Sequence, residues 1–264
     1  MRNELNNEPE FVIYSNNNDN EISAFSRRNQ TVLSLVPELA ETIDSTFLQI
    51  KPSTKVQLVI YMLSRLCVRH YEAIFLLCTN GLGFSGQRIL RSMFEKCIDA
   101  LYLNKHPNEI EDFTEYHFVQ MEKLGFADIA KKIDANFESI IEKFRIKPTK
   151  KQLRLNWSKK SLVAKAIEMG ADDWMIKYAY NLPNGFVHSS LAEILDSVIL
   201  EDEKITPVET DNNTERMFGD LCFNMSIHLV LNVLRLQLDC FDIPSRSKVE
   251  NLEIKFNNAF ISKK

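Results

Sequence analysis

The sequence has 264 residues, of which 45% are hydrophobic and 26% are charged, a mixture typical of a globular protein and unlike that of a disordered chain. Its net charge of −4 argues against a protein that coats nucleic acid through bulk positive charge. Only 7 glycines and 8 prolines are present, and this shortage of turn residues favours long helices over a β-rich fold.

The cysteines and the apolar segments bear on the cellular compartment. No C-x-x-C pair occurs, and the odd number of cysteines in apolar helical patterns indicates reduced, buried thiols. The N-terminal segment is polar and has no apolar signal-peptide core, and no run approaches about 20 uncharged apolar residues. We therefore expect a cytoplasmic protein with no membrane partner. The cysteines are Cys67, Cys78, Cys97, Cys222 and Cys240.

The predicted elements begin after a polar lead-in. Residues 1–22 are rich in Asn and Glu and are expected to form a flexible tail, whereas residues 23–264 are expected to form a single helical domain. Apolar residues at three- and four-residue steps predict long helices at about 53–79 and 84–105. Residues 107–151 follow as a predicted helical hairpin inserted at the edge of the domain.

Shorter elements lead to the C-terminus. Two short helices are predicted between residues 158 and 180, then a turn at Pro183-Asn184-Gly185 and a helix from about Phe186 to Leu200. An acidic loop precedes a long helix at about 214–241, and a last amphipathic helix closes the chain. The predicted fold is all-α, an irregular up-and-down helical bundle with the inserted hairpin at about 107–151.

One glycine motif resembles a cofactor site. Gly81-Leu-Gly83-Phe-Ser-Gly86 matches G-x-G-x-x-G, which can cradle a pyrophosphate when it follows a strand. The segment before it has helical rather than strand character, so a helix–helix connection is the better interpretation. The five histidines are scattered and form neither H-E-x-x-H nor the Glu-x-x-His of di-iron bundles. We expect no metal and no cofactor.

A basic segment suggests a candidate nucleic-acid interface. Residues 145–165 contain no acidic residue but carry Trp157 among eight cations. Such a run can hold a phosphate backbone and stack a base, although a solvated surface has the same composition. The candidate nucleic-acid-binding residues are Lys150, Lys151, Arg154, Trp157, Lys159 and Lys160.

Two further segments supply candidate catalytic residues. Arg91 and Glu95 lie one helical turn apart at the edge of an apolar face, and Asp99 continues the same line. This row is either a border salt bridge or a charged row inside a groove. His188 begins the predicted helix after the Pro-Asn-Gly turn, where the helix dipole disfavours protonation and a neutral imidazole could act as a general base. A structural histidine is the alternative.

These segments resemble a family of bacterial helical proteins known only as a domain of unknown function. The resemblance rests on Leu90-Arg91-Ser92-Met-Phe-Glu95 and on the later Tyr180-Asn-Leu-Pro-Asn-Gly-Phe-Val-His188-Ser189, and it spans roughly residues 65–200. The sequence departs from the family pattern at Pro183, where the family usually has Ser. The Arg/Glu/His pattern is similar in kind to helical ribonuclease or nucleotide-binding bundles of toxin and phage-defence systems, an analogy at the level of fold.

Two functional hypotheses follow from these observations. In the first, the protein is an interaction or assembly module in which Arg91, Glu95 and His188 form a structural polar network, and the 107–151 hairpin or the last helix binds a protein partner or a second copy. In the alternative, the protein is an RNA- or nucleotide-directed effector that works without metal. There His188 would move a proton and Arg91 would stabilise phosphate charge.

Overall fold

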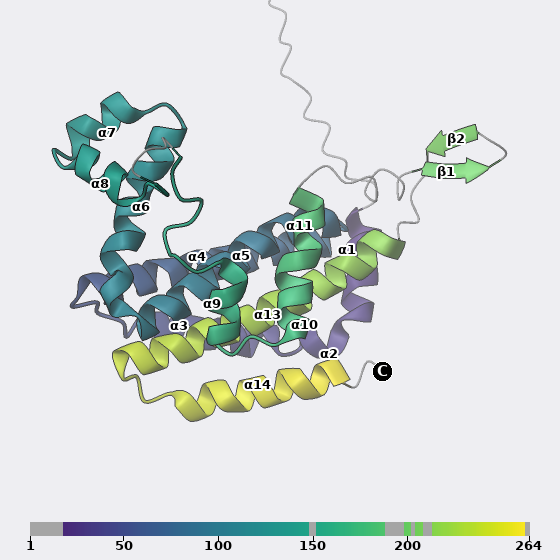
Figure 1. Cartoon of the computed structure of the whole chain (residues 1–264). Coiled ribbons are helices and arrows are strands. Elements are labelled where there is room, and N and C mark those ends of the chain that lie inside the picture. Colours follow the sequence, from purple (N-terminus) through teal and green to yellow (C-terminus); the bar gives the residue numbers. More distant parts are fainter. Residues whose placement is uncertain (1–17, 148–151, 188–197, 202–203, 208–212, 262–264) are drawn as a thin grey trace, which may run out of the picture.

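The computed structural model describes residues 18–147, 152–187, 198–201, 204–207 and 213–261. Most of these residues lie in helices (Figure 1), which confirms the predicted all-α bundle. The three longest helices, α4 (Lys55–Thr79), α5 (Gly83–Lys105) and α13 (Asn213–Phe241), pack against one another and form the centre of the bundle. Their bounds lie within a few residues of those predicted from apolar periodicity.

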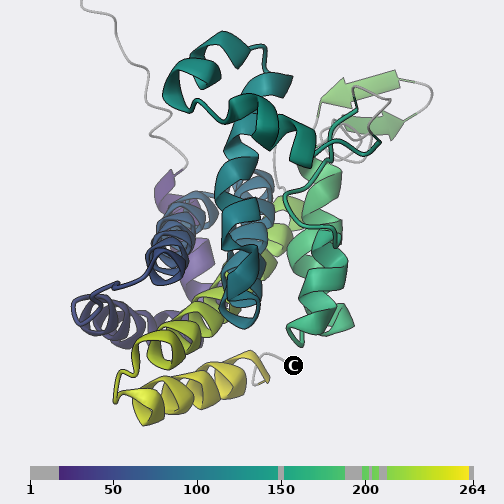
Figure 2. The ribbon, with the colours of Figure 1, turned by 60° about the vertical axis from the view of Figure 1, so that its left-hand side comes forward.

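Shorter helices surround this centre. The N-terminal helix α1 (Asn18–Arg28) begins inside the segment expected to be a tail, and α2 (Gln30–Leu33) and α3 (Val36–Phe47) follow it. Pro37 lies in the first turn of α3, where its missing N–H costs nothing. At the other end, α14 (Arg246–Ile261) runs alongside α13 in both views (Figures 1 and 2). Its residues Val249, Leu252 and Phe256 are fully buried in the core.

The predicted insertion stands up from one end of the bundle (Figure 2). After a short 3-10 turn at Pro107–Glu109 it contains α6 (Ile110–Lys123), α7 (Ala127–Ile133) and α8 (Phe137–Lys143). The predicted hairpin implies a single helix after α6, whereas the structure has two, because Asp134 adopts an extended conformation, with φ −136° and ψ 122°. The insertion shares a second apolar core with α4, α5 and α13, which contribute Ile60, Leu103 and Leu236.

Residues 173–187 are helical, although we predicted a turn within them. After α9 (Leu162–Glu168), the chain runs through α10 (Asp173–Ile176), a π-helical turn (Lys177–Asn181) and α11 (Leu182–Val187) without a break. The predicted turn at Pro183-Asn184-Gly185 is therefore wrong. Proline lacks the N–H that an α-helix interior requires, and the wider π turn directly before Pro183 accommodates this.

A two-stranded hairpin replaces the end of the helix predicted at about 186–200. Strand β1 (Val198–Glu201) pairs antiparallel with β2 (Lys204–Pro207), with Val198 opposite Pro207 and Glu201 opposite Lys204. The β-branched pair Val198-Ile199 and the pair Ile205-Thr206 prefer strands to helices. The remainder of the predicted helix, residues 188–197, lies outside the described residues.

The predicted absence of a membrane-length helix needs one qualification from α13. Of the described helices, only Thr214–Phe241 is long and apolar enough to cross a membrane, and 61% of its most apolar window is buried inside the bundle. That burial is what the central helix of a packed core requires.

The glycine motif serves the crossing of helices. A Cβ atom on Gly83 would lie 2.1 Å from the Glu215 carbonyl oxygen, and one on Gly86 would lie 3.1 Å from Cys78 Sγ and 3.2 Å from Cys222 Sγ. Gly81 has a φ of +78° and ends α4. The motif thus connects α4 to α5, as the helix–helix interpretation predicted, and its glycines also allow α5 to approach α13 closely.

Candidate functional site

The two segments that carry the predicted catalytic residues pack against each other. Arg91 on α5 donates a hydrogen bond of 2.7 Å from Nε to the Asn184 side-chain oxygen on α11. Its Nη2 lies 2.9 Å from Glu95 Oε1, and the guanidinium lies 5.5 Å from the centre of the Tyr180 ring. The Arg91 and Glu95 side chains are 26% and 35% exposed. Arg91 is therefore held on three sides by protein groups.

A second arginine strengthens the same junction. Arg88, one turn earlier on α5, donates from Nε to the Phe186 carbonyl oxygen at 2.7 Å. Phe186 in turn stacks on Phe84 at a ring separation of 4.9 Å. These contacts hold α11 against the first half of α5. His188, the third predicted catalytic residue, lies outside the described residues.

The basic segment does not present Trp157 to solvent. Its side chain is buried, 6% exposed, and packs edge-on against Tyr102 and Phe113 at ring separations of 5.8 and 5.2 Å. The predicted stacking of a nucleic-acid base on Trp157 is therefore not available in this conformation. The Trp157 ring lies in the hydrophobic core next to the insertion because removing its apolar surface from water is favourable.

Most of the neighbouring cations also have protein partners. Arg154 lies 4.5 Å from the centre of the Phe144 ring and 3.7 Å from Asp112, and Lys160 pairs with Glu168. Lys159 is exposed, whereas Lys150 and Lys151 lie outside the described residues. The part of the candidate nucleic-acid interface that can be described is thus largely engaged within the protein.

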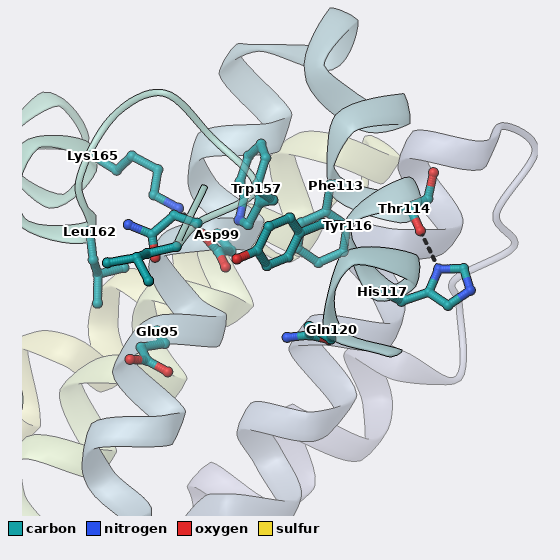
Figure 3. Close-up of a pocket in the computed structure, with 12 residues that line it drawn as sticks. Glu95, Asp99, Phe113, Thr114, Tyr116, His117, Gln120, Trp157, Leu162 and Lys165 are labelled. Atoms are coloured by element: carbon teal, nitrogen blue, oxygen red, sulfur yellow. Dashed lines mark hydrogen bonds and ion pairs between the residues drawn. The ribbon is translucent and has the colours of Figure 1, made fainter. Parts of the chain in front are cut away.

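A pocket of about 450 Å³ lies between α5, α6, α9 and the segment before α9 (Figure 3). Glu95 and Asp99 come from α5, so two members of the predicted charged row line the pocket, while Arg91 does not. Both acids share the pocket with polar and aromatic side chains of the other elements. The lining residues are Glu95, Asp99, Phe113, Thr114, Tyr116, His117, Gln120, Leu155, Asn156, Trp157, Leu162 and Lys165.

An ion pair forms the inner wall of the pocket. Lys165 of α9 pairs with Asp99, and their side chains are 3% and 17% exposed. The Lys165 ammonium lies 4.4 Å from the centre of the Trp157 ring. Burial raises the pKa of the Asp99 carboxyl, and this shift is opposed by the Lys165 charge and by the indole N–H of Trp157, which faces the carboxyl. Trp157 Nε1 nevertheless completes no hydrogen bond with a described residue.

The outer wall carries groups with free hydrogen-bonding positions. His117 Nδ1 lies 2.6 Å from the Thr114 carbonyl oxygen, an acceptor, so Nδ1 carries the proton and Nε2 is left as an acceptor when the ring is neutral. The Gln120 side chain is exposed beside it on α6. The pocket therefore combines two carboxylates, an imidazole and an amide, a set that can bind a polar molecule.

Sequence reasoning placed Asp99 in the charged row but missed Lys165 and His117 as parts of the site. A signal for Lys165 was present, since it occupies the apolar face of α9 between Leu162 and Ala166, where an unpaired ammonium is not tolerated. His117 gave no comparable signal. Its importance depends on the position of α6, which the sequence did not fix. No cluster of three or more metal-binding side chains occurs among the residues that can be described.

Comparison with known proteins identifies a family but no activity. A family model with the description "Family of unknown function (DUF5677)" matches residues 57–205, a range that includes the Arg91–Asn184 junction and the pocket. No curated protein matches this chain, and no solved structure matches it.

Proposed function

This chain belongs to the DUF5677 family of unknown function, and we propose that it is a helical interaction module that assembles with a second copy of itself. In this proposal the tip of the insertion provides the contact. Arg91 and Glu95 have a structural role, because they hold α11 on α5. The observation that carries the proposal is a group of large apolar side chains left in solvent on the α6–α7 tip.

The tip surface is formed by four residues at the end of α6 and along α7. Leu124, Phe126, Ile129 and Ile133 are 70%, 49%, 52% and 63% exposed. Residues 126, 129 and 133 follow the three- and four-residue spacing of one helix face, while Ala130 on the neighbouring face is fully buried. An apolar stripe of this kind, beside polar residues, is typical of a protein–protein contact.

The charges around the tip surface favour a second copy over a partner of a single charge. Asp128 lies in the first turn of α7, and Lys131 and Lys132 lie in its last turn. Two copies related by a two-fold axis perpendicular to α7 bring their α7 helices together antiparallel. Asp128 of one copy then lies near Lys132 of the other, so the same helix supplies both halves of an ion pair.

The first experiment measures the mass of the protein in solution by light scattering over a range of concentrations. The wild type is expected to dimerise, and the Ile129→Glu/Ile133→Glu variant is expected to remain monomeric because two carboxylates cannot be buried unpaired. Leu76→Glu on α4 is the matched control, since Leu76 is 63% exposed away from the tip. A wild type that stays monomeric at every concentration contradicts the proposal.

A charge exchange tests the antiparallel arrangement. Asp128→Lys alone places like charges opposite each other and should weaken the dimer, whereas Asp128→Lys/Lys132→Asp should restore it. A double variant that is as weak as the single one would show that the two residues do not face each other.

The RNA- or nucleotide-directed effector is kept as a second candidate because two members of the predicted charged row line a pocket. Arg91 is less suited to hold a phosphate than predicted, since Asn184, Glu95 and Tyr180 already surround it. Incubation of the purified protein with total RNA tests this candidate. Cleavage by the wild type that is lost in both Glu95→Gln and His188→Ala would favour the effector over the interaction module.

A further inference from the structure

We propose that the pocket lined by Glu95, Asp99 and His117 binds a small organic ammonium compound. The site is separate from the tip surface, so the proposal does not depend on self-assembly. The pocket's volume of about 450 Å³ falls in the range of small-molecule sites. The argument rests on which hydrogen-bonding positions in its walls are still open and on the charge of those walls.

The open positions are mostly acceptors. Arg91 contacts Oε1 of Glu95, and the second oxygen of Glu95 has no contact from the described side chains. The Asp99 carboxyl already pairs with Lys165 and faces the Trp157 indole N–H. His117 Nε2 adds a second open acceptor, because Nδ1 holds the ring proton toward Thr114. Acceptors of this kind suit a ligand that carries hydrogen-bond donors, as an ammonium group does.

The charge of the lining favours the same ligand. The pocket's charged side chains are two carboxylates, Glu95 and Asp99, and one ammonium, Lys165. Arg91 is outside this lining and pairs with Oε1 of Glu95, so the second oxygen of Glu95 is the charged acceptor that the lining presents. Lys165 is paired with Asp99 and is almost fully buried, so it is poorly accessible to an anionic ligand. A phosphate or carboxylate ligand would meet repulsion from Glu95, whereas a cation would be attracted.

Lys165 itself shows that this region accommodates an ammonium group. Its Nζ lies between the Asp99 carboxylate and the Trp157 ring, 4.4 Å from the ring centre, a cation–π arrangement. The indole N–H of Trp157 is buried and faces the Asp99 carboxyl without completing a hydrogen bond. Phe113 adds an apolar surface for the carbon skeleton.

The binding experiment uses three probes of nearly equal size that differ in charge: phenethylamine, phenethyl alcohol and phenylacetate. The protein carries Trp174→Phe, because Trp174 is 45% exposed and its removal leaves Trp157 as the sole fluorescent indole. Phenethylamine is expected to change Trp157 fluorescence and to bind at least about tenfold more tightly than phenethyl alcohol. Phenylacetate is expected to bind most weakly.

Variants in the same background locate the site. Glu95→Gln should lower phenethylamine affinity about tenfold and leave phenethyl alcohol unchanged, whereas Glu72→Gln, an exposed position on α4, should change neither. Gln120 is exposed on the rim, so its substitution should not disturb folding. Gln120→Glu should tighten phenethylamine binding and Gln120→Lys should weaken it about tenfold.

Three results would overturn the proposal. The first is equal affinity for the three probes, and the second is tighter binding of phenylacetate than of phenethylamine. The third is phenethylamine binding that is indifferent to both Gln120 substitutions. If Glu95→Gln disturbs the folded structure by loosening the Arg91 contact, circular dichroism detects the disturbance. The Gln120 variants then decide the outcome.

Discussion

Arg91 and Asn184 lie 93 positions apart in the sequence, and a hydrogen bond of 2.7 Å from the guanidinium to the side-chain amide oxygen joins them. The bond crosses from the middle of α5 to α11, directly after the π-helical turn. The same guanidinium contacts Glu95 and the Tyr180 ring. Because each contact is partly shielded from water, we expect this junction to stabilise the fold measurably.

Removing Arg91 should therefore weaken folding. Arg91→Ala is expected to lower the free energy of unfolding by about 1–3 kcal/mol, and Asn184→Ala by about 1 kcal/mol. The double variant should lose less than the sum by about 1 kcal/mol, because the two substitutions remove one shared bond. Urea denaturation measures all three values.

Arg69→Ala on α4 is the control, because Arg69 is exposed and its loss should change stability by less than about 0.5 kcal/mol. If Arg91→Ala behaves like Arg69→Ala, the structural role proposed for Arg91 is wrong.

Substitutions at two glycines should have opposite effects. A Cβ on Gly83 would lie 2.1 Å from the Glu215 carbonyl oxygen and 2.6 Å from the Gly219 nitrogen, so Gly83→Ala must push α13 away from α5. We expect a loss of about 3 kcal/mol or more. A Cβ on Gly185 in α11 meets nothing within 4 Å, so Gly185→Ala should gain about 0.5–1 kcal/mol.

Thermal unfolding monitored by circular dichroism compares the two glycine variants. Equal melting temperatures would contradict the close crossing of α5 and α13.

The long helices could be predicted because their signals are local. Apolar residues repeat at the helical period from Val56 to Cys78 and again through the next helix, and a break such as His106-Pro107 needs no tertiary information. The Pro183 turn was mispredicted because the π turn that accommodates the proline depends on packing against α5. The rule that proline and glycine end helices uses local sequence alone and does not take such packing into account.

The candidate site could be predicted only in part. The helical spacing of Arg91, Glu95 and Asp99 placed them in one row, and that row does reach a pocket. The other wall comes from α6 and α9, whose positions depend on how the insertion packs, so His117 and Lys165 were not recognised. Trp157 was misjudged because a basic segment with an aromatic looks the same whether the ring faces solvent or the core.

Trp157 should act as a core residue. Trp157→Ala is expected to lower the free energy of unfolding by about 3–5 kcal/mol, as for other buried large-to-small changes. The exposed Lys159 provides the comparison, and Lys159→Ala should stay within about 0.5 kcal/mol. Urea denaturation measures both. A Trp157→Ala protein as stable as the wild type would mean that the ring is exposed in solution, and the base-stacking role would then be open again.

Glu168 should make the free energy of unfolding depend on pH in the acidic range. The Glu168 carboxylate pairs with Lys160 and lies 2.7 Å from His106 Nε2. The hydrogen bond from Lys160 has the largest effect and that with His106 the next largest. Together they lower the pKa of Glu168 from 4.5 to about 2. In the unfolded chain the carboxyl takes up a proton at a higher pH than in the folded protein. The contribution of Glu168 is therefore fully present above pH 4.5 and is lost as the pH falls toward 2.

The measurement is the urea midpoint of the wild type and of Glu168→Gln between pH 7 and pH 2.5. Near pH 7 the wild type should be the more stable of the two, and the difference should shrink steadily below pH 4.5, since the glutamine side chain does not titrate. Lys131, exposed and paired with Glu138 at 2.7 Å, supplies a surface control: Glu138→Gln should alter the acid dependence much less, because solvent screens an exposed pair. A difference between wild type and Glu168→Gln that is the same at every pH would show that the carboxylate is not held by Lys160 and His106.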